Sequence, residues 1–281
     1  MASIVTIVPA LDEELHIARC VSSALDLGPV VVVDGGSSDA TVRLAEEAGA
    51  RVLEREWTGY ASQKNWALGM LDGAAEWILF LDADEYLTPQ ARDAVRATVG
   101  AADADGYHVG RHLVFLGRRL DHAYWYPDYQ LRLFRAGRGH FEERRVHEHL
   151  VVDGRVSESS IDVMHENLKG ISDYVGKLNR YADLEAQEIL QPSGALRQGS
   201  LRGGWPERRR ALKRVWLRMR GRAVLRFLWL YVVKRGFLDG RAGLIFCGLI
   251  AVHDFLIEAK VAEHRAGYAP AQVRERALVA D

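Results

Sequence analysis

The stretch Trp77-Ile-Leu-Phe-Leu81-Asp82-Ala-Asp84-Glu85 decides the fold class and the place of the chemistry. Five consecutive apolar residues are typical of a strand that is buried on both faces of a parallel sheet. Three carboxylates lie where this strand ends. Because ligands of open α/β sheets bind beyond the carboxyl ends of the strands, the stretch predicts an acidic site at a sheet edge.

The chain around this stretch alternates strand and helix patterns. Strands are predicted at Ser3–Val8, Pro29–Val33, Arg51–Arg55 and Trp77–Leu81, and helices at Asp12–Leu27, Thr41–Ala48 and Tyr60–Leu71. Repeated βα units predict an open α/β sheet flanked by helices. Acidic residues also follow the first two strands, in Asp12-Glu13-Glu14 and Asp34-Gly-Gly-Ser-Ser-Asp39. We therefore expect three acidic clusters to converge on one crevice.

The pattern changes beyond this region. Gly106 to about Val156 shows short strands and turns, and Ile171–Leu190 is an amphipathic helix. Glycines after Pro192 predict a flexible linker, and Glu207–Ala262 predicts two or three helices. The expected organisation is a catalytic domain at 1–191, a linker at 192–206 and a helical appendage at 207–281.

The formal net charge of −1 hides a separation of sign. Leu201–Arg241 holds 13 basic residues against 2 acidic ones, so it carries +11 and the remaining chain −12. Basic residues mixed with Trp and Leu favour an anionic membrane surface. The alternatives are helix packing, a homodimer through the C-terminal helices, and nucleic acid. No nucleic-acid motif accompanies the charge, so we expect no nucleic-acid partner.

Two further features bear on location. The charge-free apolar run Ala242–Val252 has 11 residues, and about 20 are needed to span a bilayer, so we expect the protein to lie on a membrane. Cys20 and Cys247 support neither a disulfide framework nor a cysteine zinc site, which favours a reducing cytoplasm. Met1–Pro9 has a strand pattern and no basic region typical of a secretory signal.

Asp82 and Asp84 are the sharpest chemical signal. Two carboxylates at a strand end can address one divalent cation, and Mn²⁺ or Mg²⁺ suits such ligands when substrate phosphates complete the shell. An acidic crevice repels phosphate unless a metal or basic groups intervene. A neutral imidazole could complete the coordination of a metal at Asp84, with His165 as first choice and His147 as second. The alternative is a solvated acidic turn.

Two sets of motifs, in order along most of the chain, carry a resemblance. The first comprises Val8-Pro9 with Asp12-Glu13-Glu14, Val33-Asp34-Gly-Gly-Ser-Ser-Asp39-Ala-Thr41, Gln63-Lys64-Asn65 and Asp82-Ala-Asp84-Glu85. It resembles family 2 glycosyltransferases of the GT-A fold. The second comprises Tyr126-Pro-Asp-Tyr-Gln-Leu-Arg-Leu-Phe-Arg135, Val146-His-Glu148, Ile171–Ala186 and Gly236–Leu244. It is similar to the subgroup that includes lipopolysaccharide core β-1,4-glucosyltransferases. Asp12 departs from the family, which usually has Asn there.

The resemblance implies a bacterial, inverting, metal-dependent enzyme with a helical C-terminal appendage. It would move a sugar from a nucleotide diphosphate sugar, UDP-sugar first, to a hydroxyl of a lipid-linked glycan or lipopolysaccharide core, at the inner face of the cytoplasmic membrane. Asp84 would ligate the metal. Arginines suit the charge of a departing diphosphate. The expected nucleotide-binding residues are Pro9, Glu14, Asp34, Lys64, Asn65, Asp82, Arg132 and Arg135.

An inverting transfer needs a base for the acceptor hydroxyl, worth about 10²–10⁴ in rate. Glu148 and Asp128 both qualify. Glu148 is favoured because it lies in the dense cluster Arg144-Arg-Val-His-Glu-His149. Asp128 could equally hold the acceptor sugar, or pair with Arg132 or Arg135 to fix a loop. Two other functions remain open: transfer to a peptide or protein, and nucleotide-sugar binding without turnover.

Overall fold

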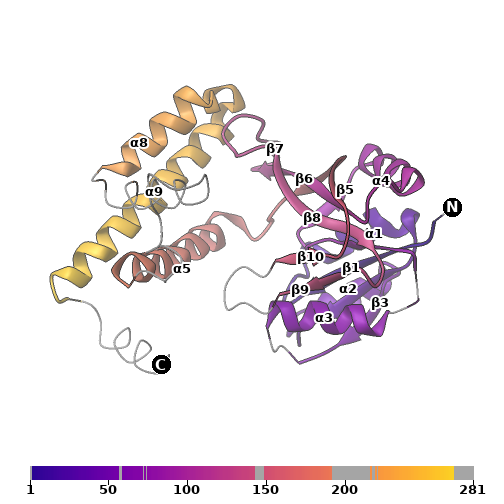
Figure 1. The fold of residues 1–281 in the computed structure, drawn as a ribbon. Coiled ribbons are helices and arrows are strands. Elements are labelled where there is room, and N and C mark those ends of the chain that lie inside the picture. Colours follow the sequence, from indigo (N-terminus) through magenta and orange to yellow (C-terminus); the bar gives the residue numbers. More distant parts are fainter. Residues whose placement is uncertain are drawn as a thin grey trace. The chain divides into compact units, whose positions relative to one another are not determined.

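The computed structural model describes residues 2–56, 59–71, 73, 75–142, 149–191, 216, 219 and 221–268. The chain forms two compact units (Figure 1). The first comprises the chain up to Asp121 together with Trp125–Leu168, and the second comprises His122–Tyr124 and the chain from Lys169 onwards. The first compact unit therefore ends before residue 191, where the sequence suggested a domain boundary. The expected linker at 192–206 lies outside the described residues.

The first unit is built on a mixed sheet with the order β3-β2-β1-β4-β8-β6-β11-β5, and β7 pairs with β6. The strands are β1 (Ile4–Ala10), β2 (Val30–Asp34), β3 (Arg51–Glu54), β4 (Trp77–Phe80), β5 (Glu85–Leu87), β6 (Gly106–Phe115), β7 (Arg118–Arg119), β8 (Asp128–Arg135) and β11 (Val156–His165). Strands β1 to β4 are parallel, and β8 runs antiparallel to β4 and β6. The strand order reverses between β1 and β4, so their carboxyl ends border the crevice in which open α/β sheets bind ligands.

Helices accompany these strands, as the alternating pattern predicts. They are α1 (Ile17–Ala24) with the 3-10 turn η1 (Leu25–Leu27), α2 (Thr41–Glu47), α3 (Tyr60–Met70) and α4 (Pro89–Ala101). A small second sheet pairs β9 (Gly139–Phe141) with β10 (Leu150–Val152). Helix α4 was not expected from the sequence. Its start carries a clear signal, because Thr88 accepts a hydrogen bond from Ala91 N at 3.2 Å and proline occupies the first turn.

Alternating side chains of the central strands feed two hydrophobic cores. Val8, Val32 and Leu79 belong to one core with residues of α1 and α4. Their chain neighbours Ile7, Val33 and Phe80 belong to the other core with residues of α3. Burial of each such side chain contributes about 1.5–3 kcal/mol, which explains why these strands show as continuous apolar runs in the sequence.

One strand of the sheet carries an extra residue. Tyr107 of β6 pairs with Leu133 of β8, but the next residue, His108, pairs with Leu131. Arg132 is therefore inserted into β8 as a β-bulge. Bulges re-aim side chains and are common next to active sites.

The second unit is helical. Its described elements are α5 (Gly170–Leu190), α8 (Arg222–Leu228), the π-helical turn η2 (Trp229–Val233), the 3-10 turn η3 (Gly236–Asp239) and α9 (Gly240–Arg265). Helix α9 packs against both α5 and α8, and Figure 1 shows α9 from orange to yellow. Ala182 and Ala186 of α5 form a small core with Ile257 and Val261 of α9. This contact explains why α5 belongs to the second unit although it follows the sheet directly in the sequence.

Two buried charges organise this unit. Asp239 accepts hydrogen bonds from the backbone N–H groups of His122 and Ala123 at 2.9 and 2.7 Å. The side chain of Arg222 is fully buried, and its Nε lies 3.7 Å from Asp254 Oδ1 and 3.5 Å from Glu258 Oε1. The unit therefore contains polar anchors as well as apolar packing.

By length and composition alone, one helical segment among the described residues could cross a membrane, Gly236–Arg265. It exceeds the 11-residue run seen in the sequence because isolated charges interrupt the run without ending the helix. About a third of its most apolar window, 33%, is buried inside the protein. The core helix of a soluble protein can have the same length and composition, so these two properties alone do not make the segment a transmembrane helix.

Candidate active site

The loops that follow β1 and β2 are joined by reciprocal hydrogen bonds. Ser38 N donates to Asp12 Oδ1 at 2.8 Å, and Asp12 N donates to Ser37 Oγ at 2.9 Å. Glu14 N donates to Asp39 Oδ2 at 3.1 Å, and Ala40 N donates to Glu14 Oε2 at 3.2 Å. Two of the three predicted acidic clusters therefore lie side by side at the sheet edge.

The carboxylate of Asp34 serves its own loop. It is 1% exposed and accepts hydrogen bonds from Gly36 N and Ser37 N, both at 2.8 Å. Ser37 Oγ donates to its other oxygen at 2.5 Å. This arrangement fixes the turn after β2. The contact of Asp34 with a nucleotide stays a prediction.

The third acidic cluster, after β4, is held by an arginine side chain. Nη2 of Arg132 donates to Asp82 Oδ2 at 2.7 Å, to Glu85 Oε1 at 2.8 Å and to Gln130 Oε1 at 2.9 Å. Arg132 is buried, and Glu85 is 1% exposed. The bulge in β8 thus brings one guanidinium against two carboxylates of the Asp82-Ala-Asp84-Glu85 turn.

The environment moves the two carboxyl pKa values in opposite directions. Burial raises the pKa of Glu85 to about 7, although Arg132 opposes the shift. Burial would also raise the pKa of Asp82, but the charge of Arg132 and its hydrogen bond outweigh it and hold that pKa well below its usual range. The turn therefore contains one firmly ionised carboxylate, Asp82, and one carboxyl group, Glu85, that takes up a proton at a higher pH than an ordinary glutamate.

A second arginine links this cluster to Asp128. Arg111 of β6 donates from Nε and Nη2 to Asp128 Oδ2 at 2.9 and 2.6 Å. Its Nη1 lies 3.9 Å from Glu85 Oε1. Ion pairs therefore run without a break from Asp82 through Arg132, Glu85 and Arg111 to Asp128. The sequence suggested Arg132 or Arg135 as the partner of Asp128, and the structure gives this place to Arg111.

Asp84 and His165 come together from different strands. Nε2 of His165, at the end of β11, lies 2.9 Å from Oδ2 of Asp84, and both side chains are 20% exposed. The pairing of Glu85 with His165 in the sheet fixes this approach. Nδ1 of His165 is buried without a hydrogen-bond partner. The first-choice imidazole predicted from the sequence therefore lies directly beside Asp84.

The structure places the remaining candidates in different surroundings. The side chain of Asn65 makes two hydrogen bonds with the backbone of Phe141. Asn65 Nδ2 donates to Phe141 O at 2.8 Å, and Phe141 N donates to Asn65 Oδ1 at 2.7 Å. Nζ of Lys64 lies 5.0 Å from the centre of the Phe141 ring, and its charge contributes to the low pKa of Asp82. Asn65 thus anchors β9, whereas the positive charge of Lys64 acts on the acidic turn through its field. Pro9 lies in β1 opposite Val33.

Arg135 lies at the wrong end of the sheet for its predicted role. It pairs with Trp77, the first residue of β4, whereas Asp82 follows the last residue of that strand. Its guanidinium stacks over the Trp77 ring at 4.7 Å and donates to Ala102 O at 3.5 Å. The structure therefore places Arg135 away from the acidic turn, and its predicted contact with a diphosphate has no support in this geometry.

Two of the predicted site residues, Glu148 and His147, lie outside the described residues. Among the described residues, no group of three or more His, Cys, Asp or Glu side chains is placed to hold a metal ion. Asp84 and His165 form a pair, so a cation between them would need further ligands from a substrate.

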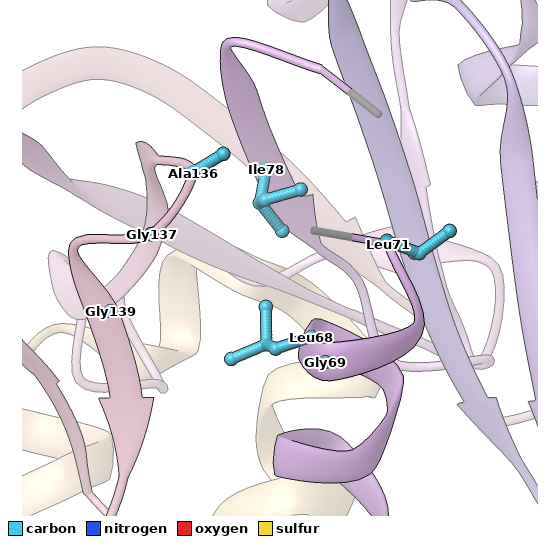
Figure 2. Close-up of a pocket in the computed structure, with 7 residues that line it drawn as sticks. All are labelled: Leu68, Gly69, Leu71, Ile78, Ala136, Gly137 and Gly139. Carbon is cyan, nitrogen blue, oxygen red and sulfur yellow. The ribbon is translucent and has the colours of Figure 1, made fainter. Parts of the chain in front are cut away.

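A hollow at the other end of β4 is separate from these groups. It is lined by Leu68, Gly69, Leu71, Ile78, Ala136, Gly137 and Gly139 (Figure 2). None of these side chains carries a titratable or hydrogen-bonding group. The hollow therefore has no part in the chemistry of the acidic turn.

Sequence reasoning missed Glu85 as the centre of the charge network, and also Arg111 and Gln130. Glu85 was visible as the last carboxylate of the turn, and its burial follows from its place in β5. Arg111 gave no signal, because its partner is 17 residues away on another strand. Gln130 and Arg132 are two residues apart in β8, but only the pairing of β8 with β6 shows that both side chains lie at the acidic turn.

The acidic turn and its basic partners thus lie at the switch point of an open α/β sheet, the place where such sheets bind ligands. The sequence profile of glycosyl transferase family 2 matches residues 5–149, and the chain belongs to this family. The predicted GT-A-like fold and the family resemblance are thereby confirmed.

Two relatives extend the match. The lipopolysaccharide core biosynthesis glycosyltransferase LpsC of Rhizobium meliloti is 29% identical over 189 residues, 64% of this chain and 69% of LpsC. An uncharacterised glycosyltransferase of Rickettsia typhi is 25% identical over 276 residues, 94% of this chain and 88% of that protein. The second relative also covers the helical unit.

Two solved structures are similar to the chain. TarS 1–349 of S. aureus in complex with UDP is 15% identical, covers 94% of this chain and 92% of its own, and has a TM-score of 0.45. Glucosyl-3-phosphoglycerate synthase from Mycobacterium tuberculosis, in complex with Mn²⁺, UDP and phosphoglyceric acid, is 24% identical. It covers 40% of this chain and 43% of its own, with a TM-score of 0.35.

Proposed function

We propose that this family 2 glycosyltransferase is an inverting enzyme. It moves a sugar from a nucleotide diphosphate sugar, UDP-sugar first, to a hydroxyl of a lipid-linked glycan. The observation that carries the proposal is the contact of Asp84 with His165 beside the Asp82–Arg132 ion pair, at the end of β4. In this family such a turn is the expected place for the donor diphosphate.

The residues at this turn fit a divalent cation. A carboxylate oxygen of Asp84 and a ring nitrogen of His165 are suitable ligands for Mn²⁺, and diphosphate oxygens would supply others. When bound, the cation neutralises charge on the diphosphate. Arg132 keeps Asp82 ionised and fixed, so that the turn keeps its shape as the donor enters. His147 stays a second candidate ligand.

The acceptor hydroxyl needs a base on the face of the sugar opposite the diphosphate. Glu148 is the first choice and Asp128 the second. Support for Asp128 comes from the two hydrogen bonds with which Arg111 orients it. A base of this kind contributes about 10²–10⁴ in rate, because it accepts the hydroxyl proton as the oxygen attacks the anomeric carbon.

One relative supports a choice of acceptor class. LpsC is by its name a lipopolysaccharide core enzyme, and its match covers most of both chains. We therefore propose a core sugar on a lipid anchor as the acceptor, and a peripheral position at the inner face of the cytoplasmic membrane. A homodimer through the C-terminal helices stays an open prediction.

A donor panel tests the proposal. Purified protein is incubated with UDP-, GDP-, TDP- and ADP-sugars, with and without Mn²⁺, and release of free nucleotide is followed. We expect one nucleotide class to be released, faster with Mn²⁺ and faster still with a lipopolysaccharide core acceptor. Absence of release from every donor, in a folded sample supplied with Mn²⁺ and acceptor, would contradict the proposal.

A further inference from the structure

One side of the segment formed by α8 and η2 is apolar and exposed. Six large side chains define what we term the apolar stripe: Val224, Leu225, Leu228, Trp229, Val232 and Val233, between 42% and 63% exposed. They recur every four residues in two parallel rows, which places them on one face of the helical segment. Phe237 and Leu238, both 47% exposed, follow in η3. Contiguous apolar surface of this kind marks an interaction site.

The charge next to the stripe has one sign. No acidic residue occurs from Arg222 to Leu238, whereas Lys234 and Arg235 follow the stripe and the exposed Arg241 comes shortly after. The acidic residue that follows, Asp239, is buried and bound to the backbone of His122 and Ala123. The surface around the stripe is therefore cationic as well as apolar.

We infer that the apolar stripe, with Lys234 and Arg235, docks onto the interface of a bilayer that contains anionic lipid. Apolar side chains insert among the acyl chains, and the cations meet the lipid headgroups. Trp229 supplies the amphipathic ring that prefers this depth. The inference deepens the proposed function and rests on it for the choice of a membrane-held acceptor.

The opposite side of the segment favours an orientation parallel to the membrane. Arg222 and Arg226 leave α8 towards α9, where Arg226 Nε donates to Asp254 Oδ2 at 2.8 Å. These paired charges lie midway along α9. Charged groups at the bilayer centre are costly, so the helices are expected to rest on the surface rather than cross it.

A second copy of the chain fits the stripe less well. In a symmetric dimer the same patch meets itself, so Lys234 and Arg235 of one copy would approach the same cations of the other. Like charges across an interface oppose association. An anionic surface removes this repulsion, and this is why we name lipid as the partner.

Vesicle flotation of the full-length protein tests the inference. The vesicles contain phosphatidylcholine alone or mixed with phosphatidylglycerol, and no sugar nucleotide is added. We expect flotation with the anionic vesicles and its loss in the double variant Leu228→Glu/Val232→Glu. The matched control, Val175→Glu/Leu184→Glu, alters exposed residues of α5 and should float like the wild type. Circular dichroism checks that each variant is folded.

The cations are tested separately. Lys234→Gln/Arg235→Gln should weaken partitioning onto anionic vesicles by about twenty-five-fold, since each cation near such a surface contributes roughly a factor of five. Partitioning onto neutral vesicles should not change. For the case that a stripe variant does not fold, brominated lipid should quench the wild-type fluorescence more strongly than that of Trp229→Phe.

Flotation of Leu228→Glu/Val232→Glu like the wild type would overturn the inference, and so would equal quenching in the wild type and Trp229→Phe. Two further results would also overturn it. One is that the protein stays on the vesicles after a wash with alkaline carbonate, and the other is that it forms a dimer in solution that Leu228→Glu dissociates. Resistance to carbonate would indicate a spanning helix, and the dimer would indicate a second copy. Because the assay omits the donor, its failure leaves nucleotide release untouched. Failure of the donor panel in turn leaves flotation untouched.

Discussion

The turns after β2 and after β4 each present two aspartates, but these aspartates have different partners. In the first loop, Asp34 and Asp39 accept hydrogen bonds chiefly from backbone N–H groups and nearby hydroxyls. In the second, Asp82 and Asp84 meet the side chains of Arg132 and His165 from distant strands. Carboxylates that accept hydrogen bonds from backbone groups fix a turn, whereas a carboxylate that meets a histidine side chain, as Asp84 does, can share that partner with a ligand.

The comparison separates structure from chemistry within one sheet edge. Both loops lie at the carboxyl ends of parallel strands, so position alone does not tell which loop acts on substrate. The two loops differ in the groups that bind their carboxylates, which are mostly backbone N–H groups in the first loop and side chains in the second. The first of the following experiments changes each loop in turn, and the others change residues outside the loop after β2.

The largest effect is expected from Asp84→Asn. Loss of the carboxylate ligand should lower nucleotide release by about a thousandfold, because the proposed cation that neutralises the diphosphate is no longer held. Calorimetry should also show loss of the Mn²⁺-dependent part of nucleotide affinity. Asp39→Asn makes the same chemical change in the other loop and should keep most of the turnover. Equal losses in both variants would show that the two loops do not differ in function.

The two candidate bases form the next test. The variant that removes the base, Glu148→Gln or Asp128→Asn, should lose about 10²–10⁴ in turnover with little change in donor affinity, because only proton removal suffers. The other variant should lose far less. Rates and donor affinities of both variants decide the choice, and two nearly normal rates would exclude both residues.

Removal of the central arginine should act on stability. Arg132→Met leaves the buried Glu85 and the partly exposed Asp82 without the cation that they share, so the free energy of unfolding in urea should fall by about 2–3 kcal/mol. Arg135→Met removes an arginine of the same strand that lies partly exposed, and should cost about 1 kcal/mol or less. Similar losses in the two variants would mean that the ion pairs of Arg132 carry no special weight.

The last comparison concerns pH. The pKa of Glu85 is raised from 4.5 to about 7, so between these values the folded protein keeps a proton that the unfolded chain has released. The contribution of this group to stability therefore falls as pH rises through that window. Glu85→Gln cannot titrate, so its free energy of unfolding should improve relative to the wild type as pH rises from 4.5 to 7. A difference that is constant with pH would refute the raised pKa.

The sheet of the first unit was predictable because its central strands β1, β2 and β4 are buried on both faces. Runs such as Val30–Val33 and Trp77–Leu81 leave little doubt about a parallel sheet, and the acidic ends of these strands follow directly in the sequence. The meeting of Asp84 with His165 was also within reach. It joins a strand end to a histidine that closes another strand pattern, and the resemblance to a known family suggested the rest.

Other features depend on pairing that a single sequence does not reveal. Arg132 and Arg135 stand three residues apart with similar neighbours, yet the first reaches Asp82 and the second stacks on Trp77. The register of β8 against β4 and β6 decides this difference. The membership of α5 in the helical unit is likewise set by its contact with α9, which lies more than 60 residues further along the chain.

The bulge in β8 makes this strand sensitive to its length. Deletion of the bulge residue Arg132 would restore regular pairing with β6 and leave its neighbours on their present faces, because Leu131 and Leu133 already pair with adjacent residues of β6. An insertion or deletion elsewhere in β8 would instead turn every side chain on one side of the cut to the opposite face. Phe134 would then leave the core that it shares with Phe80, or Gln130 would leave the acidic turn. Many substitutions along β8 keep these faces, whereas a single-codon insertion or deletion away from the bulge exchanges core for surface. Related chains that keep this chemistry should therefore vary in residue type along the strand and stay constant in residue count.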